Sequence, residues 1–370
     1  MSPRGSLRGR CACSRSKSKP GKNPAFPFLL AIPARKKLPT RPRSLNLQWP
    51  VPHIPNQAEI DQAARFLRIG RAVAFPTETV YGLGANALDA EAVARIYAIK
   101  GRPATSPLIV HVDSIEMARS LVHAWPENAD ALARKFWPGP LTLVVKKQPA
   151  IPDIVTAGLA SVGLRMPAHP VALALIRAAG VPIAAPSANR FTELSPTTAD
   201  HVRQSLGGDV DYILDGGPCA VGIESTVISL ARPQPTLLRP GGISRLELES
   251  VIGSIVAGSD PVGGAHPAPG MHARHYSPRT PLFLVTNGKL PEQGNGIYLQ
   301  HTRPPSCPNE TIKMPNEAPD YAAALYENLH QADAAGYDWI AVDLPPNAPE
   351  WEAVRDRLRR AASNVGNTGT

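Results

Sequence analysis

The sequence predicts an α/β protein with one large sheet, followed by a smaller α/β unit. Short apolar runs alternate with segments of helical periodicity along most of the chain, which is typical of helices packed on a sheet. At 370 residues the chain is long enough for two hydrophobic cores. Glycine and proline crowd residues 254–281, so we expect a linker between two domains there.

The first two helices are expected at 59–71 and 89–102. The second has Asp89 as a candidate N-cap and Gly101 as its stop. Apolar residues recur at helical spacing in the first: Ile60, Ala63, Ala64 and Leu67. Later helices are expected at 114–125, 128–137, 170–180, 198–206, 320–335 and 350–363. Strands are expected at 72–77, 107–112, 141–147, 161–167, 181–189, 212–217, 225–230, 282–286, 296–301 and 339–345.

The net charge of +9 comes from the first 55 residues. This tail holds 12 of the 39 Lys and Arg residues and none of the acids, which leaves 27 basic residues against 30 acidic ones elsewhere. The remainder of the chain is therefore slightly acidic, which argues against nucleic-acid binding through bulk charge.

Three interpretations of this tail (1–55) stay open. It is rich in Arg and Ser and free of acids, as organellar transit peptides are. It is also suited to be a basic arm that touches RNA. Its many prolines favour a third interpretation, a disordered segment without function, left untranslated if synthesis starts near Leu45 or Val51.

The cysteines indicate a reducing compartment, which we interpret as the cytoplasm. Cys11 and Cys13 lie in the tail, and Cys219 and Cys307 are isolated, so neither a disulfide framework nor a zinc-ligand spacing is present. No apolar run approaches the roughly 20 residues of a membrane span.

The common nucleotide-binding motifs are missing. The sequence contains no GxxxxGK[ST], and GLGANA supplies only the first two glycines of GxGxxG. Yet FPTETVYGLG, after the expected strand at 72–77, concentrates threonines and glycines where a turn alone needs fewer. We interpret residues 77–84 as a substrate-facing wall.

Basic and hydroxyl residues near expected strand and helix ends are candidates for binding oxyanions. Lys100 and Arg102 stand at the end of a helix, where capping and surface charge would also explain them. However, PTETVYGLG lies one helix earlier and follows a neighbouring strand. We therefore expect this segment and the one that contains Lys100 and Arg102 to face one cleft at the edge of the sheet. Ser106, His111, Arg165, Ser187, Ser195, Ser225 and Arg239 extend the same pattern. Individually, Ser195 also suits an N-cap and Arg239 a solvated surface position.

The linker contains His266, His272, His275 and Tyr276. A Gly- and Pro-rich segment rarely prepositions three imidazoles, and no carboxylate is near to support them, so no metal site is expected. Instead, we expect residues 266–278 to act as a lid over the cleft and to donate Tyr276.

Taken together, these segments resemble the YrdC-like family of L-threonylcarbamoyladenylate synthases in its long two-domain form. The matching segments are FPTETVYGLG, AIKGRPATSPLIVHV, FWPGPLTLV, SVGLRMPAHP, APSAN, GIESTVISL, LRPGG and PGMHARHYSP. The resemblance implies a YrdC-like catalytic domain at 56–253 with a large twisted sheet, the linker at 254–281, and a smaller Rossmann-like accessory domain at 282–366.

The resemblance also implies an activity. Enzymes of this family condense L-threonine, bicarbonate or CO2 and ATP into threonylcarbamoyl-AMP, releasing pyrophosphate, with Mg²⁺ on the ATP. The product serves a separate tRNA threonylcarbamoyl transferase complex that modifies adenosine 37 of tRNA, and weak binding of tRNA itself is left open.

Position by position, the resemblance assigns roles to thirteen residues. Lys100 and Arg102 would be catalytic, with Lys100 on phosphate or bicarbonate. L-Threonine would be held by Thr79, His111, Arg165, Ala185 and Ser225. ATP would be held by Arg102, Ser106, Ser161, Ser187, Ser195, Arg239 and Tyr276.

Two other functions stay open at this point. A non-catalytic RNA-binding protein of the same fold is disfavoured by the near-neutral body and the aromatic content of only 5%. An adenylate-forming enzyme for another amino acid, such as serine, differs by one methyl group, which a site discriminates by only about 1 to 3 kcal/mol.

Overall fold

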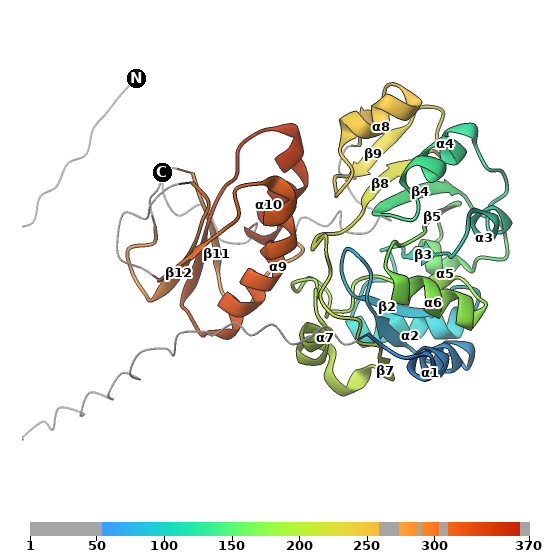
Figure 1. Cartoon of the computed structure of the whole chain (residues 1–370), viewed down its shortest axis with the longest axis horizontal. Helices are drawn as coiled ribbons and strands as arrows, with labels where there is room; N and C mark the ends of the chain where they lie inside the picture. Colours follow the sequence, from blue (N-terminus) through green and yellow to red (C-terminus); the bar gives the residue numbers. More distant parts are fainter. Residues whose placement is uncertain (1–53, 259–273, 287–289, 303–309, 363–370) are drawn as a thin grey trace, which may run out of the picture. The chain divides into compact units, whose positions relative to one another are not determined.

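The computed structural model describes residues 54–258, 274–286, 290–302 and 310–362 (Figure 1). Nearly all of the predicted tail, part of the predicted lid including His266 and His272, and Cys307 lie outside the described residues. The proposed domain boundaries stay a prediction.

Ten strands form the larger sheet, in the order β10-β9-β8-β4-β5-β3-β6-β2-β1-β7. Their bounds are β1 Val73–Phe75, β2 Gly82–Asn86, β3 Ile109–His111, β4 Leu141–Lys146, β5 Ser161–Arg165, β6 Ile183–Ala184, β7 Tyr212–Ile213, β8 Thr226–Ser229, β9 Thr236–Arg239 and β10 Val256–Ala257. The pairs β3/β5, β4/β8, β1/β7 and β9/β10 are parallel, and the other neighbours are antiparallel. Since antiparallel neighbours run in opposite directions, some strands begin at the edge where others end.

In the described part of the chain, eight α-helices accompany this sheet. They are α1 Gln57–Arg68, α2 Ala90–Lys100, α3 Ile115–Ser120, α4 Glu127–Phe136, α5 Asp153–Thr156, α6 Pro170–Ala179, α7 Ala199–Leu206 and α8 Arg245–Ile252; a short 3-10 helix, η1, covers Gly207–Asp209. The predicted ends of α2 are confirmed: the Asp89 side chain accepts from the amides of Glu91 and Ala92, and Gly101 ends the helix with φ 63°.

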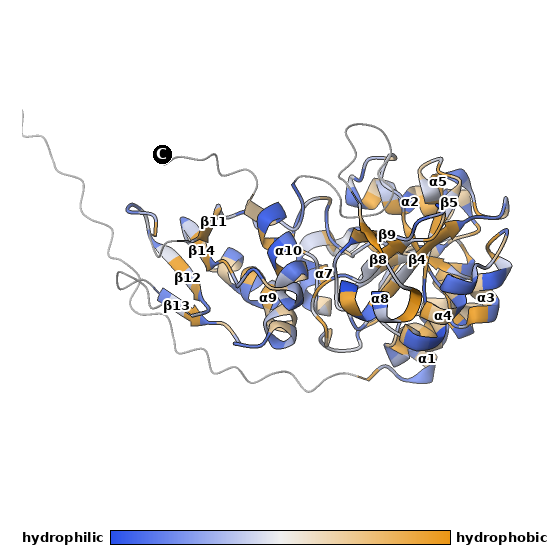
Figure 2. Ribbon diagram, turned by 90° about the horizontal axis from the view of Figure 1, so that it is seen from above, coloured by the Kyte–Doolittle hydropathy of each residue, from blue (hydrophilic) through white to orange (hydrophobic). Residues whose placement is uncertain are grey.

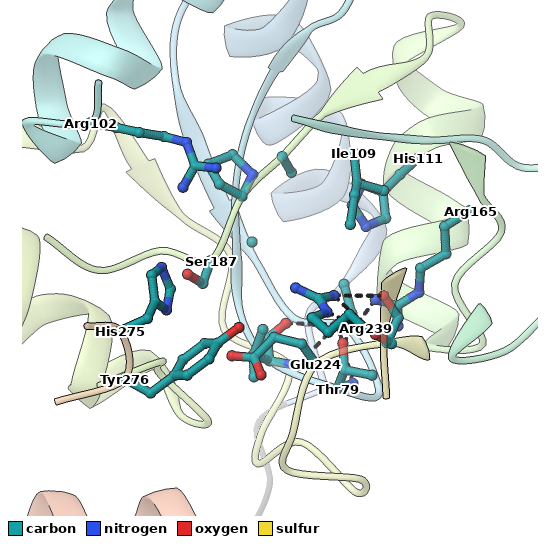
Figure 3. Close-up of a pocket in the computed structure, with 16 residues that line it drawn as sticks. Thr79, Arg102, Ile109, His111, Arg165, Ser187, Glu224, Arg239, His275 and Tyr276 are labelled. Carbon is teal, nitrogen blue, oxygen red and sulfur yellow. Dashed lines mark hydrogen bonds between the residues drawn. The ribbon is translucent and has the colours of Figure 1, made fainter. Parts of the chain in front are cut away.

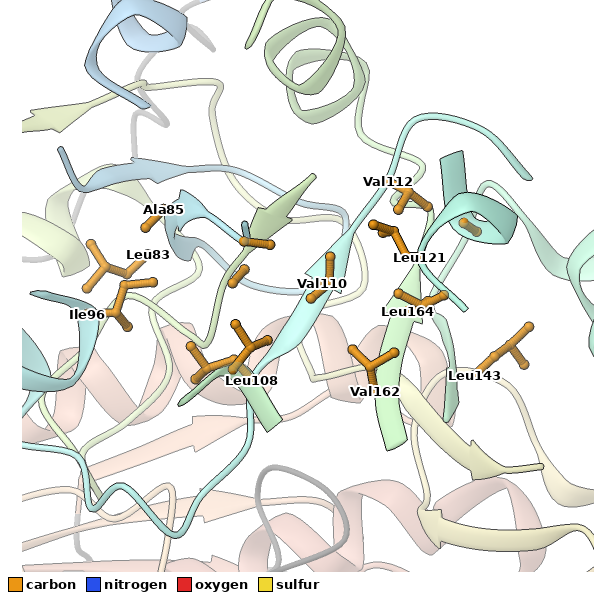
Figure 4. Close-up of a cluster of buried hydrophobic side chains, with 14 of the residues drawn as sticks. Leu83, Ala85, Ile96, Leu108, Val110, Val112, Leu121, Leu143, Val162 and Leu164 are labelled. Carbon is orange, nitrogen blue, oxygen red and sulfur yellow. The ribbon is translucent and has the colours of Figure 1, made fainter. Parts of the chain in front are cut away.

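The side-chain alternation of the strands divides the core between two faces of the sheet. Val73 and Phe75 pack with α1 and α6, whereas Ala72 and Ala74 belong to the larger cluster on the opposite face. Figure 4 shows that larger cluster, in which Leu83, Val110, Leu143 and Leu164 are contributed by four different strands and are fully buried. The hydropathy colouring agrees, because β4, β8 and β9 are orange and the exposed side of α1 is blue (Figure 2).

Seven of the strands were predicted from the sequence, but β2, β9 and β10 were not. Strand β2 has the sequence GLGAN, which lacks the β-branched residues that favour strands. Packing explains one of its glycines: a Cβ on Gly84 would lie 2.7 Å from both Ile183 Cγ2 and Phe75 Cε1. Residues 77–84 were expected to face the substrate. Gly82 does line the cavity described below, whereas Gly84 is not among its lining residues and is explained by packing.

A second sheet has four parallel strands in the order β11-β14-β12-β13. They are β11 Leu282–Val285, β12 Gly296–Gln300, β13 Glu310–Lys313 and β14 Trp339–Asp343, accompanied by α9 Ala318–Ala334, the 3-10 helix η2 Pro349–Trp351 and α10 Glu352–Ala362. Strand β13 was not predicted, because its residues ETIK are mostly exposed at the edge of the sheet and lack an apolar pattern. The parallel arrangement confirms the predicted smaller α/β unit.

Side chains of α9 and α10 contact loops of the larger sheet. His330 of α9 stacks on His201 of α7 with ring centres 3.7 Å apart and planes at 18°. His330 Nε2 also donates to the Ser195 carbonyl over 3.0 Å. No helix among the residues that the structure describes is long and apolar enough to cross a membrane.

The stacked histidines predict a loss of stability in acid. Burial, and for His330 also the neighbouring His201, lowers the pKa of each ring to about 4. The unfolded chain titrates near 6.5, so it binds more protons than the folded chain between these two values. Stability is therefore full above about pH 6.5 and falls as the pH drops to about 4, by about 3 kcal/mol for each ring.

The variant His330→Gln keeps a donor for the Ser195 carbonyl but does not titrate. Between pH 7 and pH 4.5, its free energy of unfolding in urea should fall by about 2 kcal/mol less than that of the wild type. The exposed His123, changed to Gln, serves as the control and should behave as the wild type. An unaltered pH dependence in His330→Gln would show that the stack does not titrate in this range.

Candidate active site

The candidate site lies at one edge of the larger sheet, where several strands begin or end. Strands β3 and β5 are parallel and end in His111 and Arg165, which are paired in register. Strand β8 runs antiparallel to β9, so its first residues lie beside Arg239 at the end of β9. Strand β4 lies between β5 and β8; it is antiparallel to β5 and parallel to β8. The end of β5 and the start of β8 therefore lie at the same edge of the sheet.

The turn between β1 and β2 provides two threonine hydroxyls. Thr77 Oγ1 accepts from the amides of Thr79 and Val80, both over 3.2 Å, and lies 2.9 Å from Thr79 Oγ1. Such a side-chain turn fixes the backbone without a helix or strand ladder. It holds the Thr79 hydroxyl close to Arg165.

Arg165 is buried and held on several sides. Its Nη1 donates to Thr79 Oγ1 over 2.9 Å, its Nε donates to the Gly139 carbonyl over 3.3 Å, and its Nη2 lies 2.8 Å from Glu78 Oε1. A buried ion pair of this kind is costly to break, because the remaining charge would be uncompensated. The guanidinium is therefore fixed in position before any ligand binds.

His111 lies next to Arg165 and is neutral at physiological pH. Burial, reinforced by the positive charge of Arg165, lowers the pKa of His111 to about 3. Its ring meets Phe75 edge-on, with ring centres 6.0 Å apart. The imidazole can thus donate and accept hydrogen bonds without adding charge.

Ser225 and Arg239 form a second anchor. Arg239 Nη2 donates to both the carbonyl and the hydroxyl oxygen of Ser225, over 3.0 and 3.1 Å. Thr142 Oγ1 lies 2.9 Å from the same hydroxyl. Arg239 is only 4% exposed, so the alternative of a solvated surface arginine is wrong.

Arg102 supplies a third buried guanidinium. Its Nε and Nη2 donate to the carbonyls of Ser106 and Pro107, and its charge lies 5.8 Å from the ring centre of Phe191. Burial is the main cause that lowers its pKa to about 10, which still leaves the side chain charged at neutral pH.

These side chains enclose a small cavity (Figure 3). Its free volume is about 50 Å³. His275 and Tyr276 contribute to its wall, and Tyr276 adopts φ 60°, which is rare for a bulky residue. The lining consists of Thr77, Thr79, Val80, Gly82, Arg102, Ile109, His111, Arg165, Ala185, Pro186, Ser187, Glu224, Ser225, Arg239, His275 and Tyr276.

Nine of the thirteen predicted site residues line this cavity: Thr79, Arg102, His111, Arg165, Ala185, Ser187, Ser225, Arg239 and Tyr276. Four do not: Lys100, Ser106, Ser161 and Ser195. Ser106 acts through its carbonyl, which holds Arg102. Ser161 begins β5, whereas Arg165 ends that strand, so the length of the strand separates Ser161 from the cavity edge.

Lys100 and Ser195 have structural partners that the sequence did not reveal. Lys100 is buried, and its Nζ donates to the carbonyls of Ser187 and Asn189, so it is not a surface charge. Ser195 does not cap α7, because Thr198 occupies the N-cap position. Instead, Ser195 Oγ donates to Glu224 Oε1 over 2.6 Å.

Glu224 was not among the predicted site residues, and His275 was expected only as part of the lid, without a role of its own. Glu224 stands in GIEST directly before Ser225, so the strand-end pattern pointed to its neighbour. An acidic residue is not expected where oxyanions bind. The partner of Glu224 is Arg357, which lies 133 residues away, so no local sequence pattern could indicate this pair.

The family to which the chain belongs follows from its similarity to known proteins. Residues 65–241 match the family model described as telomere recombination, and residues 243–363 match the C-terminal domain of threonylcarbamoyl-AMP synthase. Threonylcarbamoyl-AMP synthase of Pyrococcus abyssi is 42% identical over 316 residues, covering 81% of this chain and 93% of the relative. The chain belongs to the threonylcarbamoyl-AMP synthase family.

Other members of the family are similar to this chain over most of its length. The synthase of Bacillus subtilis is 43% identical over 326 residues, covering 83% of this chain and 94% of the relative. The crystal structure of P. abyssi Sua5 in complex with L-threonine matches with a TM-score of 0.78 at 39% identity, over 84% of this chain and 96% of that chain. The predicted two-domain, YrdC-like form is confirmed.

The buried contacts of Lys100 predict a structural cost of removing it. Lys100→Met leaves two buried carbonyls without their donor, so the free energy of unfolding should fall by about 2 to 4 kcal/mol. Urea denaturation measures this change, with the exposed Lys135→Met on α4 as the control. If both variants unfold at the same urea concentration, Lys100 does not hold the 187–189 loop.

Proposed function

We propose that the chain is an L-threonylcarbamoyladenylate synthase, which condenses L-threonine, bicarbonate and ATP into threonylcarbamoyl-AMP and pyrophosphate. One observation carries this proposal: three buried guanidiniums, those of Arg102, Arg165 and Arg239, surround a single cavity that also contains threonine and serine hydroxyls. Carboxylate and phosphate oxygens are the groups that such donors bind.

The threonine half of the site is assigned to the end of β5. Arg165 would bind the threonine carboxylate, with the Thr79 and Ser225 hydroxyls and the neutral His111 nearby to orient the amino acid. Arg165 Nη1 and Nη2 each carry a second N–H besides the one that faces Thr79 or Glu78, and the substrate carboxylate would accept from these. The Ala185 backbone would complete the pocket wall.

The nucleotide half is assigned to Arg102 and Arg239, with Ser187 and Tyr276 beside them. Among the described lining residues Glu224 is the one carboxylate, and Arg357 Nε lies 2.7 Å from its Oε2. Mg²⁺ would therefore arrive with ATP, held by phosphate oxygens and water, which is how this ion often binds at phosphate sites. Bound there, it would neutralise charge on the departing pyrophosphate.

The chemistry needs positioning more than a dedicated acid–base pair. The threonine amine attacks the carbon of bicarbonate, water is lost, and an oxygen of the resulting carbamate attacks the α-phosphorus as pyrophosphate leaves. Aligned reactants and fixed cations lower both barriers. This agrees with a lining whose described residues are rich in arginine and hydroxyl groups and include one carboxylate.

The cavity is too small for both substrates as it stands. Its volume of about 50 Å³ is well below the ~300 to 1,000 Å³ of ligand pockets. His275 and Tyr276 would therefore move to admit ATP and then return, excluding water from the labile carbamate. We infer that they form the described part of the lid.

Beyond the site, the proposal places the protein in tRNA modification. The product would pass to a threonylcarbamoyl transferase complex that acts on adenosine 37, and a cytoplasmic location fits this role. Threonylcarbamoyl-AMP synthases that are 37% to 43% identical to this chain support the proposed activity.

The decisive assay is pyrophosphate release from ATP, with bicarbonate, across the twenty amino acids. We expect release that depends on both L-threonine and bicarbonate. Release stimulated by serine instead would indicate an adenylate-forming enzyme with another substrate. A folded protein that releases no pyrophosphate with any amino acid would favour the RNA-binding alternative.

Arg165→Lys tests the threonine half. Lysine keeps the charge opposite Glu78 but loses the guanidinium fork, so the KM for threonine should rise about tenfold or more, with a smaller change for ATP. This variant is better than Arg165→Ala, which would leave Glu78 as an unpaired buried charge. The exposed Arg177→Lys on α6 is the control; threonine kinetics equal to those of this control would remove Arg165 from the site.

A further inference from the structure

Glu224 brings a buried carboxylate into a cavity that is otherwise cationic. The residue is 6% exposed and lines the cavity together with Arg102 and Arg239. A triphosphate bound to these guanidiniums would be repelled by a second anion in the same poorly solvated space. The synthase function proposed above, on which this inference rests, therefore requires that the charge of Glu224 be compensated.

Arg357 of helix α10 provides the compensating charge. Its side chain is 1% exposed, and its Nε donates to Glu224 Oε2 over 2.7 Å. Its Nη2 donates to the Pro240 carbonyl over 3.0 Å, and its guanidinium carbon lies 5.1 Å from the ring centre of Tyr276. One residue of α10 thus contacts the loop before β8, the loop after β9 and the tyrosine in the cavity wall.

Two further donors fix the direction of the Glu224 carboxylate. Ser195 Oγ donates to Oε1 over 2.6 Å, and the Tyr326 hydroxyl of α9 lies 3.3 and 3.2 Å from the two oxygens. All three donors are buried, with exposures of 1% or less. The carboxylate is therefore bound by protein donors on both oxygens.

Arg239 is the other cation that acts on Glu224. Burial opposes ionisation of this carboxyl, but attraction by Arg357 and then by Arg239 holds its pKa below the usual value. If Arg357 were lost, Glu224 would depend on Arg239 for compensation. The ATP phosphates would then compete with Glu224 for the same guanidinium.

We propose that Arg357 is a positioning residue for the nucleotide site: it binds the Glu224 carboxylate so that Glu224 does not compete with the ATP phosphates for Arg239. The smaller α/β unit thereby contributes to nucleotide binding through one charge, without itself touching the substrate. The loss of Arg357 should therefore weaken the binding of ATP and not that of threonine, because Arg165, which would bind threonine, is paired with Glu78 and not with Glu224.

The test uses full-length protein and MgATP, with the dissociation constant measured by calorimetry and the KM values by pyrophosphate release. Arg357→Met should weaken ATP binding about tenfold or more, while the KM for threonine changes by less than about twofold. Adding Glu224→Gln removes the uncompensated charge, so the double variant should bind ATP within about threefold of the wild type. Arg359→Met, exposed on the same helix, is the matched control.

Two results would overturn the proposal. The first is an ATP dissociation constant for Arg357→Met equal to that of Arg359→Met. The second is a double variant that binds ATP about tenfold or more weakly than the wild type, because rescue would then be absent; this comparison with the wild type still decides if the single variant does not fold. Failure of the synthase function has a different signature, since the wild type would release no pyrophosphate with threonine.

Discussion

The directions of the strands in the larger sheet determine where the site lies. Because β3 and β5 are parallel, His111 and Arg165 end side by side. Because β8 and β9 are antiparallel, Ser225 before one strand and Arg239 at the end of the other reach the same edge. A shift of one residue in any of these pairings would turn the side chains to the opposite face. The register is therefore as important to the site as the identity of its residues.

Buried charge is the second constraint on this edge. Each guanidinium is held by protein acceptors: Arg102 by carbonyls, Arg239 by Ser225, and Arg165 by Thr79 and Glu78. Donors that are fixed before the substrate arrives need little reorganisation when charge develops on a phosphate. The same contacts explain why the site residues are also important for stability.

Much of this arrangement could be predicted from the sequence, because strand ends and helix caps leave local signals. Asp89 and Gly101 mark α2, and the hydroxyl and basic residues expected near strand and helix ends include six that line the cavity: Arg102, His111, Arg165, Ser187, Ser225 and Arg239. What the sequence does not reveal are partners that are distant along the chain. Lys100 binds carbonyls 87 and 89 residues away, and Arg357 binds a carboxylate 133 residues away. No local pattern encodes such pairs, so the structural contacts of Lys100 and the burial of Glu224 against Arg357 could not be predicted.

We propose that one sheet edge binds threonine at Arg165 and the nucleotide at Arg102 and Arg239. A crystal structure of the protein with threonylcarbamoyl-AMP would show both contacts in one complex. We expect the threonyl carboxylate within about 3 Å of the Arg165 guanidinium, and the phosphate within the same distance of Arg102 or Arg239. A ligand bound elsewhere, for example in the cavity between Ile243 and Ala318, would contradict it.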